Sequence, residues 1–270
     1  MTASRATAPD GCGLAYSILT DAGPEAPRLA LVHSLAMDRH FWDGVADSLS
    51  DSASILALDC RGHGESDKPA GPYSAERFGD DLAAVLDAAG WKDAVVAGSS
   101  MGGCVALAFA ARHPGRTRGL GLIDTTAWYG DDAPDAWAGR ATKAQSGGMA
   151  ALIDFQVSRW FSDAFRESRR DVVEAAISTF LRNDVEAYAA TCHMLGACDL
   201  RATLPGIAAP TRVIVGEEDY ATPVAMATVL RDGIPGAEMT VLGGVRHFTP
   251  LECPDRIAAE LTTLIEASQA

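Results

Sequence analysis

Short apolar runs alternate with amphipathic helical patterns along most of the 270 residues. Runs of Val, Ile, Leu and Ala that end at glycine or polar turn residues are typical of buried parallel strands. They predict strands at residues 13–19, 28–32, 54–58, 95–97, 119–123, 211–215 and 238–242. Amphipathic spacing predicts helices at 73–89 and 254–267. This order predicts an α/β fold with a mostly parallel, doubly wound sheet of about eight strands.

The alternation stops after Asp124, and from about residue 127 to 200 the pattern is helical and rich in aromatic residues. We interpret this segment as a helical cap over a site. Residues 1–126 then form the first part of an α/β core and residues 201–270 the second. Most of the aromatic residues are expected to form the core of the cap itself. Trp128 is the exception: it lies just past a strand end, where open α/β sheets bind ligands, and is therefore predicted to contact substrate.

The pentapeptide Gly98-Ser99-Ser100-Met101-Gly102 stands between an apolar strand and an alanine-rich helical pattern. A strand, a sharp turn and a helix in this order form a nucleophile elbow, in which the central serine has a strained backbone and an exposed hydroxyl. Small residues also gather at tight turns for steric reasons alone, so the alternative is a purely structural turn. The flanking strand and helix favour Ser100 as a catalytic nucleophile.

A second turn, His33-Ser34-Leu35, follows the strand at residues 28–32. In acyl-transfer enzymes, a backbone N–H of this loop and the N–H after the nucleophile hold the developing oxyanion. We assign these donors to Leu35 and Met101. Ser34 is a candidate substrate contact, or else a plain turn residue. His33 is expected to be a hydrogen-bonded structural histidine.

Three acidic residues, Glu217, Glu218 and Asp219, follow the predicted strand at residues 211–215. A catalytic triad needs a carboxylate that orients the histidine and stabilises its charged form. Asp219 is the predicted acid because it precedes a helix start at Thr222-Pro223, with Thr222 as N-cap. Glu217 and Glu218 remain alternatives, and Asp124 is a further one at the preceding strand end.

His247 lies in a loop between the last predicted strand and the last predicted helix, and is the predicted general base. Three other histidines lie in or at the end of predicted helices: His40, His113 and His193. The order Ser100, Asp219, His247 gives nucleophile, acid and base in the chain order of α/β-hydrolases.

Composition narrows the function further. The formal net charge of −14 argues against a nucleic-acid partner, which requires basic patches. The sequence has no run of about 20 apolar residues that could span a membrane, and residues 1–10 lack a signal-peptide core, so we expect a cytoplasmic protein. The six cysteines lack metal-ligand spacing, and the polar turn at residues 59–66 is interpreted as structural. We expect neither a metal nor an organic cofactor.

From about Gly13 to Ala267 the sequence resembles the α/β-hydrolase superfamily, through the motifs at residues 98–103, 59–66 and 216–223 and through His247. Within that superfamily it is most similar to 3-oxoadipate enol-lactonases and related lactone hydrolases. This similarity rests on residues 33–38, 159–161, 188–192 and 198–200. The sequence departs from the pattern at Ser34, where many members have glycine, and at Arg246, where a small residue is expected. The resemblance implies an acid-bearing lactone, for which the cap offers four candidate cations: Arg140, Lys143, Arg159 and Arg166.

The sequence therefore predicts hydrolysis of a small-molecule carboxylic ester or lactone through an acyl-enzyme. A cofactor-free perhydrolase or a carbon–carbon bond hydrolase would use the same triad. A ligand-binding receptor with incidental turnover is the alternative from another functional class. A soluble α/β domain with a chance Gly-x-Ser-x-Gly is the simplest alternative.

Overall fold

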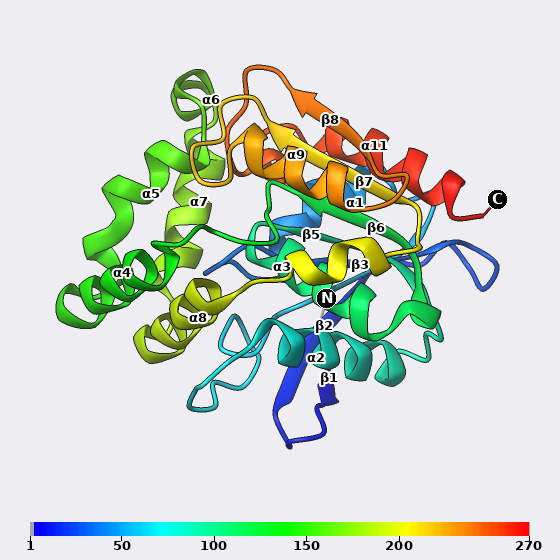
Figure 1. The fold of residues 1–270 in the computed structure, drawn as a ribbon, viewed down its shortest axis with the longest axis horizontal. Coiled ribbons are helices and arrows are strands. Elements are labelled where there is room, and N and C mark those ends of the chain that lie inside the picture. The colour runs from blue at the N-terminus through cyan, green and yellow to red at the C-terminus, as the bar shows by residue number, and fades with distance from the viewer. Residues whose placement is uncertain (1–2, 270) are drawn as a thin grey trace.

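The computed structural model describes residues 3–269 and contains one eight-stranded sheet in the order β1-β2-β4-β3-β5-β6-β7-β8 (Figure 1). Strand β2 pairs antiparallel with β1 and β4, whereas every other neighbouring pair is parallel. The predicted mostly parallel sheet is thus confirmed. The strands are β1 (Ser4–Thr7), β2 (Gly13–Thr20), β3 (Arg28–Val32), β4 (Ser54–Leu58), β5 (Ala94–Ser99), β6 (Thr117–Ile123), β7 (Thr211–Gly216) and β8 (Glu238–Leu242).

Strand β1 was not predicted from the sequence. It has only four residues, and of these only Ala6 is buried. A short strand at the edge of a sheet needs no apolar run, because one of its faces and its outer edge remain in water. The hydrophobic pattern therefore carries almost no signal there.

Helices cover both faces of the sheet. On one face α2 packs on α3, which lies against β3, β5 and β6, and on the other face α1 packs on α11, which lies against β6 and β7. The α-helices are α1 (Asp43–Ser48), α2 (Ala75–Ala88), α3 (Met101–Arg112), α4 (Ala133–Gly147), α5 (Ile153–Trp160), α6 (Asp163–Ser168), α7 (Arg170–Leu181), α8 (Val185–Ala197), α9 (Val224–Gly233), α10 (Thr249–Glu252) and α11 (Pro254–Ala267). Short 3-10 helices are η1 (Arg39–Trp42), η2 (Pro114–Arg116), η3 (Met149–Leu152) and η4 (Arg201–Gly206).

Helices α4 to α8 lie together between β6 and β7 in the chain and gather at the left side of the molecule in Figure 1. We call residues 127–200 the helical insertion. Its two ends are joined: the Leu200 N–H donates to the Ala127 carbonyl at 2.8 Å, and Trp128 and Asp199 form an antiparallel β-bridge. The insertion therefore leaves and re-enters the core at one place.

An aromatic cluster joins the helical insertion to the core. The rings of Trp160 and Phe248 stack with their centroids 4.8 Å apart, and Phe161 meets Phe248 edge-on at 5.7 Å. Phe180 extends the cluster by packing edge-on against Trp160. All four side chains are buried, so the insertion is held by a shared hydrophobic core as well as by its two ends.

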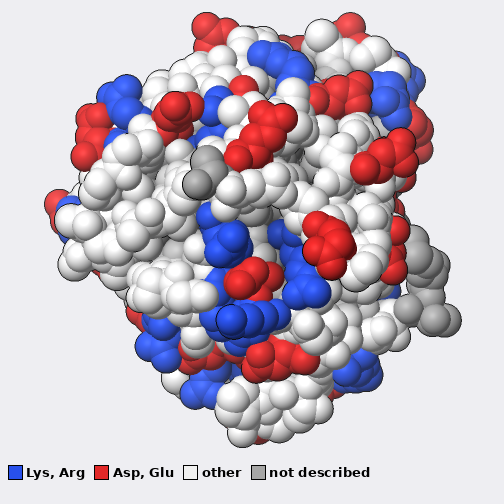
Figure 2. Space-filling view, turned by 90° about the vertical axis from the view of Figure 1, so that its right-hand side faces the viewer, with Lys and Arg blue, Asp and Glu red and all other residues white. Residues whose placement is uncertain are grey.

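The opposite side of the molecule carries a basic hollow. Figure 2 shows Lys and Arg side chains gathered around acidic ones on this side. The lining of one cavity of the molecule includes Arg28, Arg118 and Asp93. These residues lie at or next to the starts of β3, β6 and β5, at the opposite edge of the sheet from the carboxyl ends of these strands. Ligands of open α/β sheets bind at the carboxyl ends of the strands, so we expect the candidate site at that end of the sheet.

The described residues contain no helix that is both long enough and apolar enough to cross a membrane. All six cysteines lie among these residues, are free thiols, and, apart from the half-buried Cys253, are buried.

Candidate active site

The turn between β5 and α3 has the backbone that the elbow motif predicts. Ser100 has φ 55° and ψ −117°, a conformation that non-glycine residues rarely adopt. A Cβ atom on Gly98 would lie 2.0 Å from the Gly102 carbonyl oxygen, and one on Gly102 would lie 2.1 Å from the Val32 carbonyl oxygen. The two glycines are therefore required by close backbone approach, which forces Ser100 to the tip of the turn.

A chain of hydrogen bonds starts at this serine. The Ser100 hydroxyl lies 2.9 Å from His247 Nε2, and His247 Nδ1 lies 2.8 Å from Asp219 Oδ2. The three residues come from the loops after β5, β8 and β7, which meet because these strands are parallel. All three are buried, yet Ser100 and His247 also line a cavity. The structure thus brings together the three residues predicted to form a triad.

Asp219 is held in place by its own loop. Its Oδ1 accepts hydrogen bonds from the N–H groups of Ala221 at 2.7 Å and Thr222 at 2.9 Å, and its Oδ2 accepts one from the Thr222 hydroxyl at 2.9 Å. Burial alone would raise the pKa of Asp219, but the adjacent His247 and these donors lower it below its ordinary value. A charged carboxylate facing Nδ1 fixes the tautomer in which Nε2 can accept a proton from Ser100.

The predicted start of the following helix is corrected. Thr222 is not its N-cap, because α9 begins at Val224 and Pro223 occupies the N-cap position with an extended backbone. The Thr222 hydroxyl instead donates a hydrogen bond to the Asp219 carboxylate, and a hydrogen bond to a charged acceptor is stronger than one between neutral groups. A residue expected to begin a helix therefore serves the carboxylate.

The other two acidic residues of this loop have different partners. Glu217 accepts a hydrogen bond from the Gly244 N–H at 3.2 Å, and Glu218 faces Arg246 across 3.4 Å. Both lie on the outer side of the loop, toward solvent. Of the three neighbouring acids, Asp219 alone has His247 as a hydrogen-bond partner.

Asp124, the remaining alternative, joins two loops. Its carboxylate accepts hydrogen bonds from the Gly216 N–H at 3.0 Å and from the Thr249 hydroxyl and N–H at 2.6 and 3.2 Å. Burial and the neighbouring Asp219 raise the pKa of Asp124 well above its ordinary value. Asp124 therefore braces the loops that carry Asp219 and His247 without contacting the imidazole.

The loop after β3 lies beside the elbow. The His33 Nδ1–H donates to the Ser34 carbonyl at 2.8 Å, and Nε2 accepts from the Cys60 N–H at 3.0 Å, which confirms the structural role expected for His33. Ser34 and Leu35 line the same cavity as Ser100. Met101 is the first residue of α3, so its N–H has no acceptor inside the helix. Leu35 and Met101 both lie beside Ser100. Their assignment as the oxyanion donors remains a prediction.

A second histidine supports this loop from behind. The rings of His33 and His63 have centroids 5.1 Å apart, and both side chains are buried. The His63 Nδ1–H donates to the Arg61 carbonyl at 3.0 Å. Burial, and then the proximity of His33, lower the pKa of His63 to about 3, and burial lowers the pKa of His33 as well. Both histidines are neutral at pH 7.

The cavity next to Ser100 and His247 is small, with a volume of about 50 Å³. Residues of the helical insertion form much of its wall, although the sequence did not single out most of them as substrate contacts. The lining residues are Ser34, Leu35, Ser100, Tyr129, Trp137, Arg140, Gln156, Arg159, Trp160, Ala221, Thr222 and His247.

Trp128, the predicted substrate contact, does not line this cavity. Its backbone is paired with Asp199 at the root of the insertion, and its indole ring lies under the Arg201 guanidinium at 3.7 Å. The neighbouring Tyr129 faces the cavity instead. The position after a strand end correctly identified the segment that reaches the cavity. Which of its side chains faces the cavity is determined by the β-bridge.

Two of the four candidate cations face the cavity, namely Arg140 on α4 and Arg159 on α5. Within residues 3–269 neither has a carboxylate at ion-pair distance, although both lie near the ring of Phe155. Burial and then the like charge of Arg140 lower the pKa of Arg159. By contrast, Lys143 is exposed to solvent and Arg166 is paired with Asp163.

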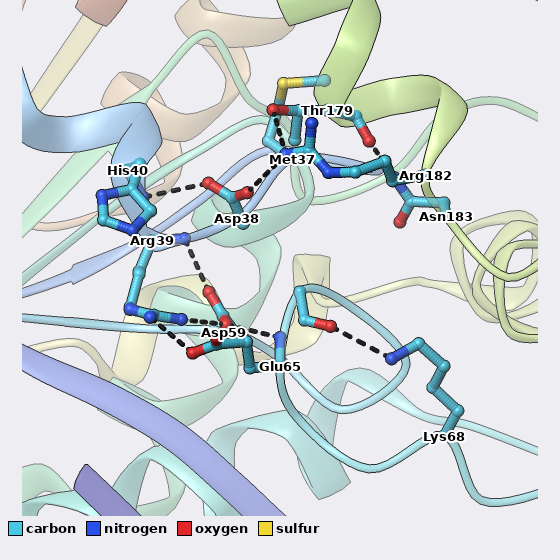
Figure 3. A pocket seen from close by; sticks show the side chains of 11 residues that line it. Met37, Asp38, Arg39, His40, Asp59, Glu65, Lys68, Thr179, Arg182 and Asn183 are labelled. Atoms are coloured by element: carbon cyan, nitrogen blue, oxygen red, sulfur yellow. Dashed lines mark hydrogen bonds and ion pairs between the residues drawn. The ribbon is translucent and has the colours of Figure 1, made fainter. Parts of the chain in front are cut away.

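A larger cavity of about 380 Å³ lies on the other side of the loop after β3 (Figure 3). Its charged groups largely neutralise one another: Arg39 pairs with Asp59 at 2.5 Å and with Glu65 at 2.6 Å, as the dashed lines show. Lys68 reaches in from the opposite wall and donates to the Gly64 carbonyl. The cavity contains neither Ser100 nor His247 and is not the candidate active site.

Comparisons with known proteins agree with this arrangement. A 3-oxoadipate enol-lactonase from Acinetobacter baylyi is 30% identical over 241 residues, which is 89% of each chain. The crystal structure of the enol-lactonase from Burkholderia xenovorans LB400 superposes with a TM-score of 0.93 at 33% identity, covering 97% of this chain and 100% of the other. A malate-bound thermophilic esterase from Thermogutta terrifontis gives a TM-score of 0.92 at 26% identity, covering 100% of both chains.

The sequence model of the alpha/beta hydrolase fold matches residues 27–254, which include the elbow, the acid loop and the histidine loop. The two solved structures named above are an enol-lactonase and an esterase by name, and each superposes over almost the whole of this chain. On these grounds, and with an eight-stranded sheet that carries a serine elbow at its centre, the chain belongs to the α/β-hydrolase fold family.

Proposed function

We propose that this protein is a serine hydrolase that opens a small lactone, or cleaves a small carboxylic ester, bearing a carboxylate group. The observation that carries the proposal is the hydrogen-bonded chain from Ser100 through His247 to Asp219 at the wall of a cavity. Similarity to enol-lactonases favours a lactone over a linear ester.

The reaction begins when the Ser100 oxygen attacks the substrate carbonyl carbon and His247 Nε2 takes the hydroxyl proton. The charge that develops on the carbonyl oxygen is held by the N–H groups of Leu35 and Met101. Asp219 stabilises the imidazolium that forms. The carbon–oxygen bond of the ester then breaks, and His247 returns the proton to the leaving oxygen.

In a lactone the leaving oxygen stays attached to the acyl chain, so the ring opens without release of a fragment. A water molecule then attacks the acyl-enzyme and gives a proton to His247. The bond between the acyl carbon and the Ser100 oxygen breaks, His247 returns the proton to Ser100, and the product leaves as an acid. Each step uses side chains and backbone groups of this chain.

The helical insertion serves as a cap that selects the substrate. Arg140 and Arg159 place two positive charges in the cavity, and residues 3–269 provide no carboxylate partner for either, so a carboxylate on the substrate would relieve their mutual repulsion. The two arginines at the cavity wall and the small volume of the cavity support a compact anionic substrate. Ser34 lies at the same wall and is the candidate polar contact from the core.

The test is acid release from a panel of five- and six-membered lactones and matched linear esters, each made with and without a carboxylate. Wild-type protein is compared with Ser100→Ala, Arg140→Gln and the exposed-cation control Lys143→Gln. We expect turnover of carboxylate-bearing lactones that Ser100→Ala abolishes. Arg140→Gln should raise KM for these substrates about tenfold or more, since a hydrogen bond to a charged group is lost, while Lys143→Gln should not.

Four outcomes would overturn parts of this proposal. Full activity in Ser100→Ala would refute the acyl-enzyme. A preference for linear esters would make the protein a general carboxylesterase. Substrate binding without turnover by the wild-type protein would favour a receptor, and turnover confined to peroxide-dependent or carbon–carbon bond cleavage would favour the other chemistries that such a triad can support.

A further inference from the structure

The residue before His247 is an arginine whose side chain reaches the helical insertion. Arg246 Nη1 lies 2.9 Å from the Ser158 carbonyl oxygen, 3.0 Å from the Phe161 carbonyl oxygen and 2.9 Å from Asp163 Oδ1. Only 11% of this side chain is exposed. The guanidinium thus ties the base-carrying loop to the end of α5 and the start of α6.

These acceptors suit an arginine. The last carbonyl groups of a helix have no partner within the helix and carry the negative end of its dipole, so a cation there is stabilising. Ser158 lies in the last turn of α5, and Phe161 is its C-cap. A small residue at position 246 would leave these groups without the guanidinium donor.

The residue after His247 is attached to the same segment. The Phe248 N–H donates to the Trp160 carbonyl at 2.9 Å, and the two rings stack. His247 is therefore flanked on both sides by residues anchored to the end of α5. The same helix end carries Arg159 and Trp160, which line the cavity.

The acid loop joins this arrangement from the other side. The Arg246 guanidinium lies over the Tyr220 ring at 5.2 Å, and Arg159 donates to the Tyr220 carbonyl. The Arg246 carbonyl lies against Gly216, where an added Cβ atom would come within 2.3 Å of it. Movement of α5 cannot occur without loosening contacts on both the acid loop and the histidine loop.

We propose that Arg246 is a positioning residue that couples the seating of the helical insertion to the placement of His247 for catalysis. It rests on the proposed hydrolase function. When α5 is seated, Arg246 and Phe248 hold the imidazole between Ser100 and Asp219, and the cavity wall is complete. When the Arg246 contacts are lost, the base and the wall lose their common anchor.

The experiment compares Arg246→Ala and Arg246→Lys with the control Arg212→Ala. Arg212 is similarly enclosed and forms ion pairs with Glu238 and Glu260. Arg212→Ala therefore also removes a largely buried arginine and its ion pairs, but at a place away from the catalytic loops. Steady-state hydrolysis of p-nitrophenyl acetate reports on the base, because this small neutral ester needs no arginine contact. The best carboxylate-bearing lactone of the panel reports on the cavity wall, and thermal unfolding reports on stability.

We expect Arg246→Ala to lower kcat for p-nitrophenyl acetate about tenfold or more, since small displacements of a catalytic group cost that much. KM for the anionic lactone should rise in the same variant. Arg246→Lys should recover part of kcat, because one ammonium group reaches some of the acceptors. Arg212→Ala should lower the midpoint of thermal unfolding while retaining kcat.

The inference is refuted if Arg246→Ala keeps kcat within about twofold of the wild-type protein, or if Arg212→Ala loses kcat equally. Should Arg246→Ala fail to fold, Arg246→Lys decides alone: unchanged kcat and KM would refute the coupling, and a lowered kcat with an unfolding midpoint at or above that of Arg212→Ala would support it. Failure of the proposed function is distinguishable, because then wild-type activity is absent or does not depend on Ser100.

Discussion

Acidification should destabilise this protein through two histidines that take no part in the proposed chemistry. His63 and His33 are buried beside each other and neutral, and the pKa of His63 is lowered to about 3. In the unfolded chain a histidine titrates near 6.5. Between these values the unfolded state binds a proton that the native state does not, so the free energy of unfolding falls as the pH is lowered.

The size of the effect follows from this difference. Between pH 7 and pH 5 the unfolded His63 becomes almost fully protonated, whereas the native ring stays neutral. Integration of the linkage relation gives a loss of about 2 kcal/mol in the free energy of unfolding from His63 alone. His33 contributes in the same direction, because burial lowers its pKa too.

Urea unfolding, followed by tryptophan fluorescence at pH 7, 6 and 5, measures this loss in the wild-type protein and in His63→Asn. The asparagine amide can replace the Nδ1–H donor to Arg61 but does not titrate, so it serves as the matched control. The drop in the free energy of unfolding from pH 7 to pH 5 should be about 2 kcal/mol smaller in His63→Asn. Equal drops in the two proteins would show that His63 is protonated in the native state and would refute the reasoning.

Two substitutions test the elbow and the acid. Asp219→Asn should lower kcat about 10³- to 10⁴-fold, because an amide cannot stabilise the charged His247 imidazole, and steady-state assays that find less than a tenfold loss would rule out Asp219 as the triad acid. Gly102→Ala places a Cβ atom 2.1 Å from the Val32 carbonyl oxygen, so it should abolish activity and lower the unfolding midpoint, whereas Gly115→Ala, which enters open space, should do neither. Equal behaviour of the two glycine variants would contradict the close approach at the elbow.

The sheet could be predicted from the sequence because its strands are bounded by turn residues. The runs that became β3, β4 and β8 start and end where the apolar pattern does, and all seven predicted strands lie within two residues of the observed bounds. Strand β1 could not be found in this way, since its stability comes from pairing with β2 at the sheet edge. The hydrophobic pattern of the sequence therefore predicts buried strands, whereas an exposed edge strand forms because of the strand with which it pairs.

The candidate site divides along the same line. Ser100, Asp219 and His247 could be chosen from sequence because each follows a predicted strand, and parallel strands bring their ends together. The cavity wall could not, because it depends on how helices of the insertion pack. Arg140 and Arg159 face the cavity because of how α4 and α5 pack, which the local sequence pattern does not show. Trp128 turns away from the cavity because its backbone pairs with Asp199.

The joined ends of the helical insertion have a practical consequence for protein engineering. Because the Ala127–Leu200 hydrogen bond and the Trp128–Asp199 bridge bring both ends to one place, the segment can be exchanged as a module across a single short gap. A donor module must also supply two carbonyl groups at the positions where those of Ser158 and Phe161 accept hydrogen bonds from Arg246. Grafts that match the ends but not these two acceptors should fold and yet remain poor catalysts, which gives designers a geometric criterion for choosing the donor.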